Sequence, residues 1–159
     1  MIRSNGQRRK SAQMQNKAIL EALETRQLLS TYTVGPGGNF TTLQAAANVV
    51  QAGDVVNVAA GNYAGFQLST SGTASAPITF NAATGVIVNG APADLNGEID
   101  ISGCSYVTLN GFDLELNGST ASRAGIWGGG YAGDNVNGLL IENNTVNGAD
   151  WWGDRKSVV

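Results

Sequence analysis

The sequence predicts an all-β fold in which short parallel strands wind into a solenoid. The 159 residues include 22 glycines but only 3 prolines, and this composition suits many short strands joined by tight bends. Apolar and polar residues alternate in runs such as Val107-Thr108-Leu109 and Phe112-Asp113-Leu114, as expected of strands with one buried face. Similar runs recur at intervals of about 23–32 residues, which is typical of stacked structural repeats.

The break at Asn110-Gly111, between two of these runs, permits two interpretations. A two-residue break of this type is a common hairpin turn. It also serves as a bend between parallel strands that belong to successive sheets of a solenoid. The pattern of Val107–Leu114 returns 32 residues later at Leu139–Val146. Earlier alternating runs begin at Ile78, 29 residues before Val107, and at Val55, 23 residues before Ile78. The recurrence favours the solenoid over the hairpin.

One helix is predicted near the start of the body, over Thr41–Ala52. Thr41 is expected to be its N-cap, with Gln44 three residues later completing a capping box. The apolar residues of this segment follow helical spacing, so that one face is buried, and Gly53 follows as the expected C-terminal stop. A helix at this place in the chain is expected to cap the open end of the solenoid.

The predicted strands share alternating polarity and glycine- or asparagine-rich flanks. They are Thr31–Val34, Val55–Val58, Phe66–Leu68, Ile78–Phe80, Val86–Val88, Ile99–Ile101, Val107–Leu109, Phe112–Leu114 and Leu139–Ile141, with a last short strand at Thr145–Val146. Asn143 and Asn144 are expected to stack in a bend of the solenoid, because asparagine tolerates left-handed backbone. Cys104, next to a glycine, is expected to be a small packed residue rather than a nucleophile.

Charge is distributed unevenly along the chain. Eight of the nine basic residues lie in Met1–Arg26 or at Arg155 and Lys156, which leaves Arg123 as the single cation between them. The body is therefore acidic, so nucleic acid is not expected as a partner, since phosphate binding needs clustered Lys and Arg. The chain has no histidine and one cysteine, which excludes a Ser-His-Asp site and an internal disulfide. No apolar run reaches the ~20 residues of a membrane span.

Three regions are expected. Residues 1–30 form a basic, helix-prone leader in which Leu20–Ser30 resembles the LEPR-x-LL motif of large exported bacterial surface proteins, with Thr25 in place of its proline. Residues 31–153 form the body. Residues 154–159 resemble the translation of a sequencing adapter and are interpreted as an artefactual tail. We therefore expect an exported chain, located outside the cell or on its surface, that is truncated at its C-terminus and lacks the rest of its parent polypeptide.

The body resembles right-handed parallel β-helix proteins of the pectate-lyase-like superfamily, in particular their polysaccharide lyase branch. The resemblance rests on Gly38–Ala46 followed by Ala52–Val58 and Gly61–Tyr63, which are similar to the N-terminal cap, and on the coil segments Ser71–Phe80, Ser105–Phe112 and Ile141–Val146. It implies a right-handed β-helix with a short N-terminal capping helix. It does not by itself imply an activity, because these motifs are structural.

Lyases of this superfamily remove a proton next to a uronate carboxylate, which needs a base and often a calcium ion or another positive charge. Arg123 is the candidate base in the body, and the alternative is that it is an exposed loop arginine without a catalytic role. Calcium, the one cofactor considered, prefers ~6–8 oxygen ligands, and the candidate ligands are Asp100, Asp113, Glu115 and Asp134. Simple exposed polarity is the alternative for these carboxylates. Aromatic side chains that would stack on sugar rings, or else cover a further coil, are Trp127, Tyr131, Trp151 and Trp152.

Two functions follow as hypotheses. The first is an exported polysaccharide-active protein, lyase-type and acting on an acidic glycan, present as an N-terminal fragment that lacks most catalytic residues. The second is a non-catalytic surface or adhesive β-helix module of a large multi-domain protein. The scarcity of Lys and Arg in the body favours the second hypothesis, whereas the closeness of the coil segments to the lyase branch favours the first. The partner in either case is an acidic or neutral polysaccharide.

Overall fold

A computed structural model describes residues 29–90, 95–116, 124–129 and 135–148 of the chain. Twelve strands and one short helix, α2 (Leu43–Ala47), make up these parts. The strands are β1 (Thr31–Val34), β2 (Val55–Val58), β3 (Gly61–Tyr63), β4 (Phe66–Gln67), β5 (Ile78–Ala82), β6 (Val86–Val88), β7 (Ile99–Asp100), β8 (Val107–Asn110), β9 (Asp113–Glu115), β10 (Ile126–Trp127), β11 (Leu140–Glu142) and β12 (Thr145–Asn147).

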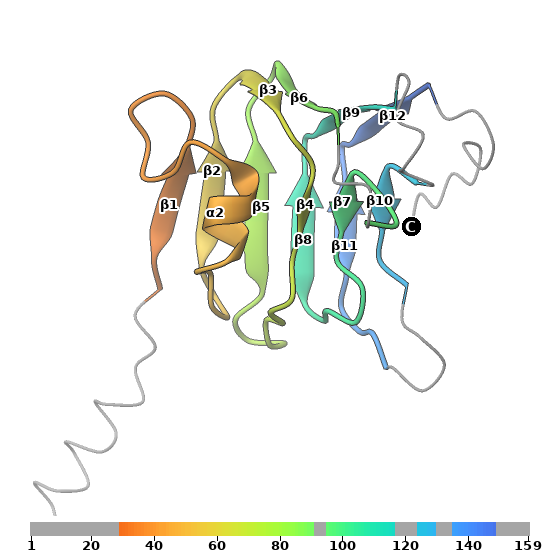
Figure 1. Ribbon diagram of the computed structural model, residues 1–159. Coiled ribbons are helices and arrows are strands. Elements are labelled where there is room, and N and C mark those ends of the chain that lie inside the picture. The colour runs from red at the N-terminus through yellow and green to blue at the C-terminus, as the bar shows by residue number, and fades with distance from the viewer. Residues whose placement is uncertain (1–28, 91–94, 117–123, 130–134, 149–159) are drawn as a thin grey trace, which may run out of the picture.

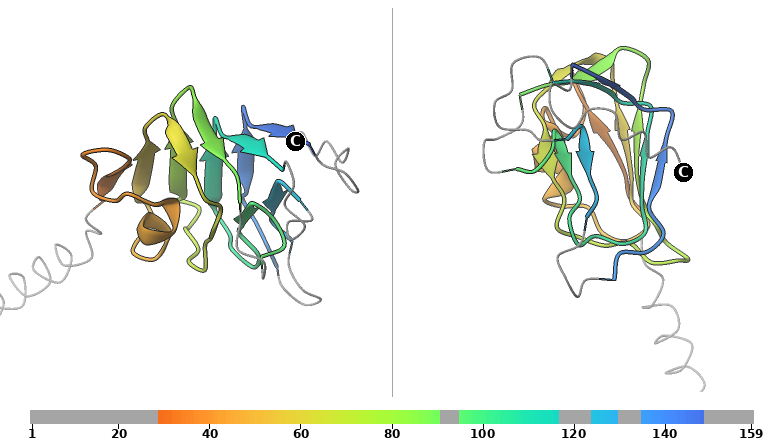
Figure 2. Two further views of the ribbon diagram at one scale, coloured as in Figure 1. Left: turned by 45° about the horizontal axis from the view of Figure 1, so that its top comes forward. Right: turned by 90° about the vertical axis from the view of Figure 1, so that its right-hand side faces the viewer.

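The strands form three parallel sheets that wind into a β-solenoid of about three turns (Figure 1). Sheet A has the order β1-β2-β5-β8-β11, sheet B has β12-β9-β6-β3, and sheet C has β10-β7-β4. The chain visits sheets A, B and C in rotation, and seen along the axis the three sheets surround a common interior (Figure 2). The solenoid prediction is confirmed, whereas its right-handed winding stays a prediction. Because β8 and β9 belong to different sheets, the hairpin interpretation of Asn110-Gly111 is wrong.

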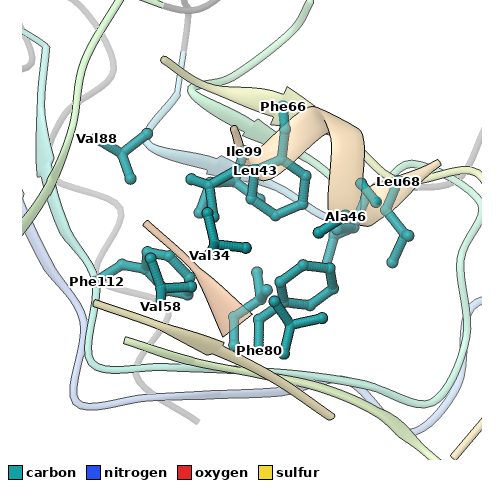
Figure 3. Packing of buried hydrophobic residues seen from close by; sticks show 14 of the residues in the cluster. Val34, Leu43, Ala46, Val58, Phe66, Leu68, Phe80, Val88, Ile99 and Phe112 are labelled. Carbon is teal, nitrogen blue, oxygen red and sulfur yellow. The ribbon is translucent and has the colours of Figure 1, made fainter. Parts of the chain in front are cut away.

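The interior is filled by one residue in two from each strand, stacked in register along the axis. Val56 pairs with Phe80, which pairs with Leu109, and all three side chains are completely buried. In sheet C the inward residues are Phe66 and Ile99. The rings of Phe66 and Phe80 meet across the interior with centroids 5.1 Å apart (Figure 3). Each turn therefore buries its apolar row against the next turn.

The first turn is closed by local structure at its outer edges. In β1, the Thr33 N–H donates to Asn39 Oδ1 at 2.8 Å, and the Thr33 carbonyl accepts from the Phe40 N–H at 3.1 Å. In β4, the Gln67 N–H donates to Gln44 Oε1 at 2.9 Å, and the Gln67 carbonyl accepts from Gln44 Nε2 at 3.0 Å. These contacts satisfy strand edges that would otherwise present unpaired backbone groups.

The helix prediction needs three corrections. The helix is one turn long and ends at the C-cap Asn48, rather than spanning Thr41–Ala52 and stopping at Gly53. Its N-cap is Thr42, whose Oγ1 accepts from the Ala45 N–H at 3.2 Å. The predicted capping box does not form, because Gln44 instead bonds the backbone of β4. The expected burial is confirmed, since the four residues of the predicted apolar face, Leu43, Ala46, Ala47 and Val50, are buried. Leu43 and Ala46 are seen in the interior in Figure 3.

Strand register agrees with the predicted repeat in two of three cases. Ile78 pairs with Val107 as expected from the 29-residue interval, and β11 pairs with β8 at the predicted interval of 32. Val55, however, pairs with Thr79 and not with Ile78. The reason is the strand pleat: Ile78 points inward whereas Val55 does not, so pairing them would place inward and outward rows on one face. Pairing Val56 with Phe80 keeps the inward rows together.

The bends between sheets A and B depend on glycine and asparagine. Gly111 and Asn143 hold equivalent positions in successive turns, with φ of 83° and 54°, which is left-handed backbone that few other residues tolerate. Asn144 then bonds the bend beneath it: its Nδ2 donates to the Leu109 carbonyl and its Oδ1 accepts from the Phe112 N–H. The prediction that these asparagines stack in a bend is confirmed.

Candidate functional site

The candidate sugar-binding residue that the structure describes is Trp127, in the last strand of sheet C. Its strand neighbour Ile126 pairs with the buried Ile99, so Trp127 takes the outer face and pairs in register with Asp100. The Trp127 side chain is 40% exposed. An exposed indole on a sheet surface provides a flat apolar area with a polar edge, which suits stacking against a sugar ring.

Asp100, next to Trp127, is held by its own chain rather than exposed. Asp100 is only 1% exposed, although its side chain projects from the outer face of sheet C. Oδ1 accepts from the N–H and the hydroxyl of Ser102, and Oδ2 accepts from the N–H of Asn96 at 3.2 Å and from its side-chain amide at 3.3 Å. Four donors thus occupy the carboxylate, which compensates the cost of burying it and leaves little room for a cation.

Asp113 and Glu115 lie together on sheet B. They alternate with the buried Leu114 along β9, so both side chains point outward. Nδ2 of Asn147, in the next turn, donates to Asp113 Oδ1 and to Glu115 Oε1, each at 3.0 Å. The two carboxylates therefore converge as the sequence predicted, and an amide stands between them.

The described parts of the chain do not gather three or more metal-ligating side chains. Asp100 belongs to sheet C, whereas Asp113 and Glu115 belong to sheet B. The fourth predicted ligand, Asp134, lies outside the described residues. Because Asp100 is saturated by hydrogen bonds and lies on another sheet, it does not join Asp113 and Glu115 in one metal site. Calcium at the Asp113 and Glu115 pair stays a prediction.

The remaining predicted site residues lie outside the described parts of the chain. They are Arg123, Tyr131, Trp151 and Trp152. The residue after Arg123 is described: the Ala124 carbonyl accepts from the Glu98 N–H at 3.0 Å, at the start of β7. In sequence, Arg123 therefore immediately precedes the described segment that enters sheet C, the same sheet that presents Trp127.

The described residues carry carboxylates but no cation. Their acidic members are Asp54, Glu98, Asp100, Asp113, Glu115 and Glu142, while every Lys and Arg of the chain falls elsewhere. Asp54 has a structural role, because its carboxylate accepts the N–H groups of Ser30 and Gln51 ahead of β2. Asp54, Glu98 and Asp100 are buried, so the described carboxylates that meet solvent are Asp113, Glu115 and Glu142. Their negative charge disfavours a polyanion at the described surface.

Cys104 is buried, and its thiol lies 3.1 Å from the Leu68 carbonyl, to which it donates. Burial, and to a lesser degree the charge of Asp100, raises the pKa of this thiol above the ordinary value of 9.0. A raised thiol pKa disfavours the nucleophilic thiolate. Its predicted role as a packed residue is confirmed.

A shallow cleft of about 440 Å³ lies beside the first turn. Its described lining contains no charged side chain and consists of Thr33, Val34, Pro36, Gly37, Gly38, Asn57, Val58, Ala59 and Ala83. The cleft lacks the aromatic and convergent polar groups that mark small-molecule sites. It therefore adds no chemistry to the surface of sheet C.

Sequence reasoning missed the partners that define these carboxylates. Asn147 is separated from Glu115 by 32 residues, the repeat interval, so the repeat could have indicated that they are neighbours. Asn96 and Ser102 flank Asp100 in sequence, but nothing in their spacing indicates that they bury it.

No protein-family model, curated protein or solved structure matches the chain. Among the described residues no helix is long and apolar enough to cross a membrane.

Proposed function

We propose that the chain is a polysaccharide-binding β-solenoid module of an exported bacterial surface protein, with the outer face of sheet C as its contact surface. The exposed indole of Trp127 on a regular sheet is the observation that carries the proposal. Tryptophan is usually well buried, and exposed aromatic residues dominate the energetics of binding surfaces. A solenoid adds a rigid, extended surface that matches an extended ligand.

The electrostatics of the described residues support a neutral glycan over an acidic one. These parts of the chain hold no cation, and three of their six carboxylates, Asp113, Glu115 and Glu142, are not buried. A uronate polymer would meet like charge unless a cation or the stretch containing Arg123 compensated it. A neutral glycan needs only stacking and hydrogen bonds, for which the exposed Trp127 is suited. Gln67 is exposed in the same outward row, on the other side of the covered Asp100.

The test is binding of the chain to a panel of neutral and uronate polysaccharides by affinity electrophoresis and calorimetry. Trp127→Ala is expected to weaken binding about tenfold, or ~1.4 kcal/mol, the scale of a truncated aromatic anchor. Leu140→Ala is the matched control, since Leu140 is 44% exposed but belongs to sheet A. Equal affinity of both variants and the unmodified chain, or no binding to any polymer of the panel, would contradict the proposal.

A lyase acting on an acidic glycan is the second candidate. The resemblance of the coil motifs favours it, together with the fact that Arg123 immediately precedes the segment that enters sheet C. The arginine would serve as base or as the positive group that neutralises the uronate. Ultraviolet absorbance of unsaturated uronide product measures this directly. Product from the unmodified chain that is lost in Arg123→Ala supports the lyase, whereas product that persists in the variant would contradict this role of the arginine.

A further inference from the structure

Asparagine followed by glycine occurs seven times in the chain, and this pair has a chemistry of its own. The glycine backbone nitrogen attacks the asparagine side-chain carbonyl carbon most easily when no side chain hinders the approach. Two pairs, Asn5-Gly6 and Asn117-Gly118, lie outside the described residues. The described pairs begin at Asn89, Asn96, Asn110, Asn137 and Asn147, so the structure allows them to be compared.

Two of the five described side-chain amides are held by carboxylates. The Asn96 amide donates to Asp100 Oδ2 at 3.3 Å. The Asn147 amide donates to Asp113 and to Glu115. Hydrogen bonds to charged acceptors are stronger than neutral ones, and they must break before the carbonyl carbon can turn toward the following nitrogen.

Two more are held by neutral groups. The Asn110 amide bonds Asn81 and accepts from Asn143 at 2.9 Å, while the N–H of the following Gly111 is itself bonded to the Glu142 carbonyl. Asn137 makes a longer side-chain bond of 3.4 Å, but both of its flanking peptides are fixed: its N–H donates to Ser105, and its carbonyl accepts from the Tyr106 N–H at 2.7 Å.

Asn89 differs from these four. It follows β6, and its own N–H is anchored to the Tyr63 carbonyl at 2.9 Å. Its side-chain amide and the N–H of Gly90 make no hydrogen bond with the described parts of the chain, and both residues are exposed. Gly90 has a φ of 75° with no atom within 4 Å of the position of an added Cβ. Reaction of the Asn89 side chain with the Gly90 nitrogen therefore breaks no hydrogen bond to the described parts of the chain.

We propose that Asn89 is the described site at which the folded protein undergoes spontaneous modification to aspartate and isoaspartate. The Gly90 nitrogen forms a bond to the Asn89 side-chain carbonyl carbon, and ammonia leaves with the proton of the Gly90 nitrogen, giving a succinimide. Water then adds to either ring carbonyl, and opening of the ring gives an aspartyl or isoaspartyl residue. The net change is addition of one water and loss of one ammonia, without oxidation or reduction.

The product places a new carboxylate beside the existing pair on sheet B. Ile87 pairs with Asp113, and Val88 pairs with Leu114, so one step further along the strands residue 89 lies in line with Glu115. Like charges at neighbouring positions of a sheet repel. Modification is therefore expected to change the charge of the sheet B surface without entering the core.

The test is peptide mapping by mass spectrometry after incubation of the folded chain in mildly alkaline buffer, with fragmentation that separates aspartate from isoaspartate. Asn89 is expected to convert at least about fivefold faster than Asn110 and Asn147, since opening one hydrogen bond is worth ~1 kcal/mol. In the chain denatured with guanidinium, the five rates are expected to become similar. Asn89→Gln is expected to remove the fast conversion and leave the other sites unchanged. A folded-state rate at Asn89 equal to or below those of Asn110 and Asn147 overturns the proposal.

Discussion

Replacement of Gln44 by alanine tests the way in which the solenoid is closed at its first turn. The Gln44 amide makes two hydrogen bonds to the backbone of Gln67, at 2.9 and 3.0 Å, in the place of a neighbouring strand. A hydrogen bond of this kind contributes about 1 kcal/mol net. Because Gln67 is exposed, water replaces part of the loss in the variant. We expect Gln44→Ala to lower the free energy of unfolding by about 1–2 kcal/mol.

Urea unfolding followed by circular dichroism measures this change, and the slope with denaturant is expected to stay constant because the exposed area does not change. Gln51→Ala is the matched control, since Gln51 is exposed and only its backbone is hydrogen-bonded; its effect is expected within about 0.5 kcal/mol. Gln44→Glu keeps the shape but sets an acceptor against the Gln67 carbonyl, so it is expected to cost at least as much as alanine at neutral pH. Equal stability of Gln44→Ala and Gln51→Ala would refute the strand-edge role.

Three further outcomes are expected. Asn144→Ala loses two hydrogen bonds to the bend of the preceding turn and should lower the free energy of unfolding by about 2 kcal/mol in a urea titration. Its control is Asn62→Ala, at an exposed strand position, which should leave the free energy of unfolding unchanged. Phe80→Ala empties a completely buried position and should cost about 3–5 kcal/mol by calorimetry. The raised pKa of Cys104 means that the unfolded thiol ionises first; its contribution to stability is full below pH 9.0 and is lost as the pH rises beyond it. Cys104→Ser should remove this alkaline loss, and an unchanged pH profile would contradict it.

Much of the fold could be predicted because each turn of a solenoid repeats the pattern of buried and exposed residues of the turn before it. Alternation along each strand and the recurrence of Val107–Leu114 at Leu139–Val146 fixed which segments stack. What could not be predicted depends on partners that are distant in sequence. Gln44 fits the local sequence pattern of a capping box, but its side chain is hydrogen-bonded to the edge of β4, 23 residues away in sequence. Val55 pairs one residue later than the repeat predicted, because strands stack by their inward rows and not by their first residues.

The candidate site was less predictable than the fold. Convergence of Asp113 and Glu115 follows from their spacing on one strand, because side chains two apart share a face. The burial of Asp100 does not follow from alternation, since the segment containing Asn96 folds over the outer face of sheet C and encloses it. Loops of this kind have no periodic pattern from which their position could be inferred.

Disulfide cross-linking tests the central claim, the stacking of parallel strands in register, most directly. In a Cys104→Ser background, Thr79→Cys with Thr108→Cys places two thiols at register partners of β5 and β8, within the distance that a disulfide spans. Thr108→Cys with Asp113→Cys instead joins positions that face each other only if Asn110-Gly111 is a hairpin turn. The solenoid predicts a rapid disulfide in the first pair and none in the second. A disulfide in the second pair and none in the first would contradict it.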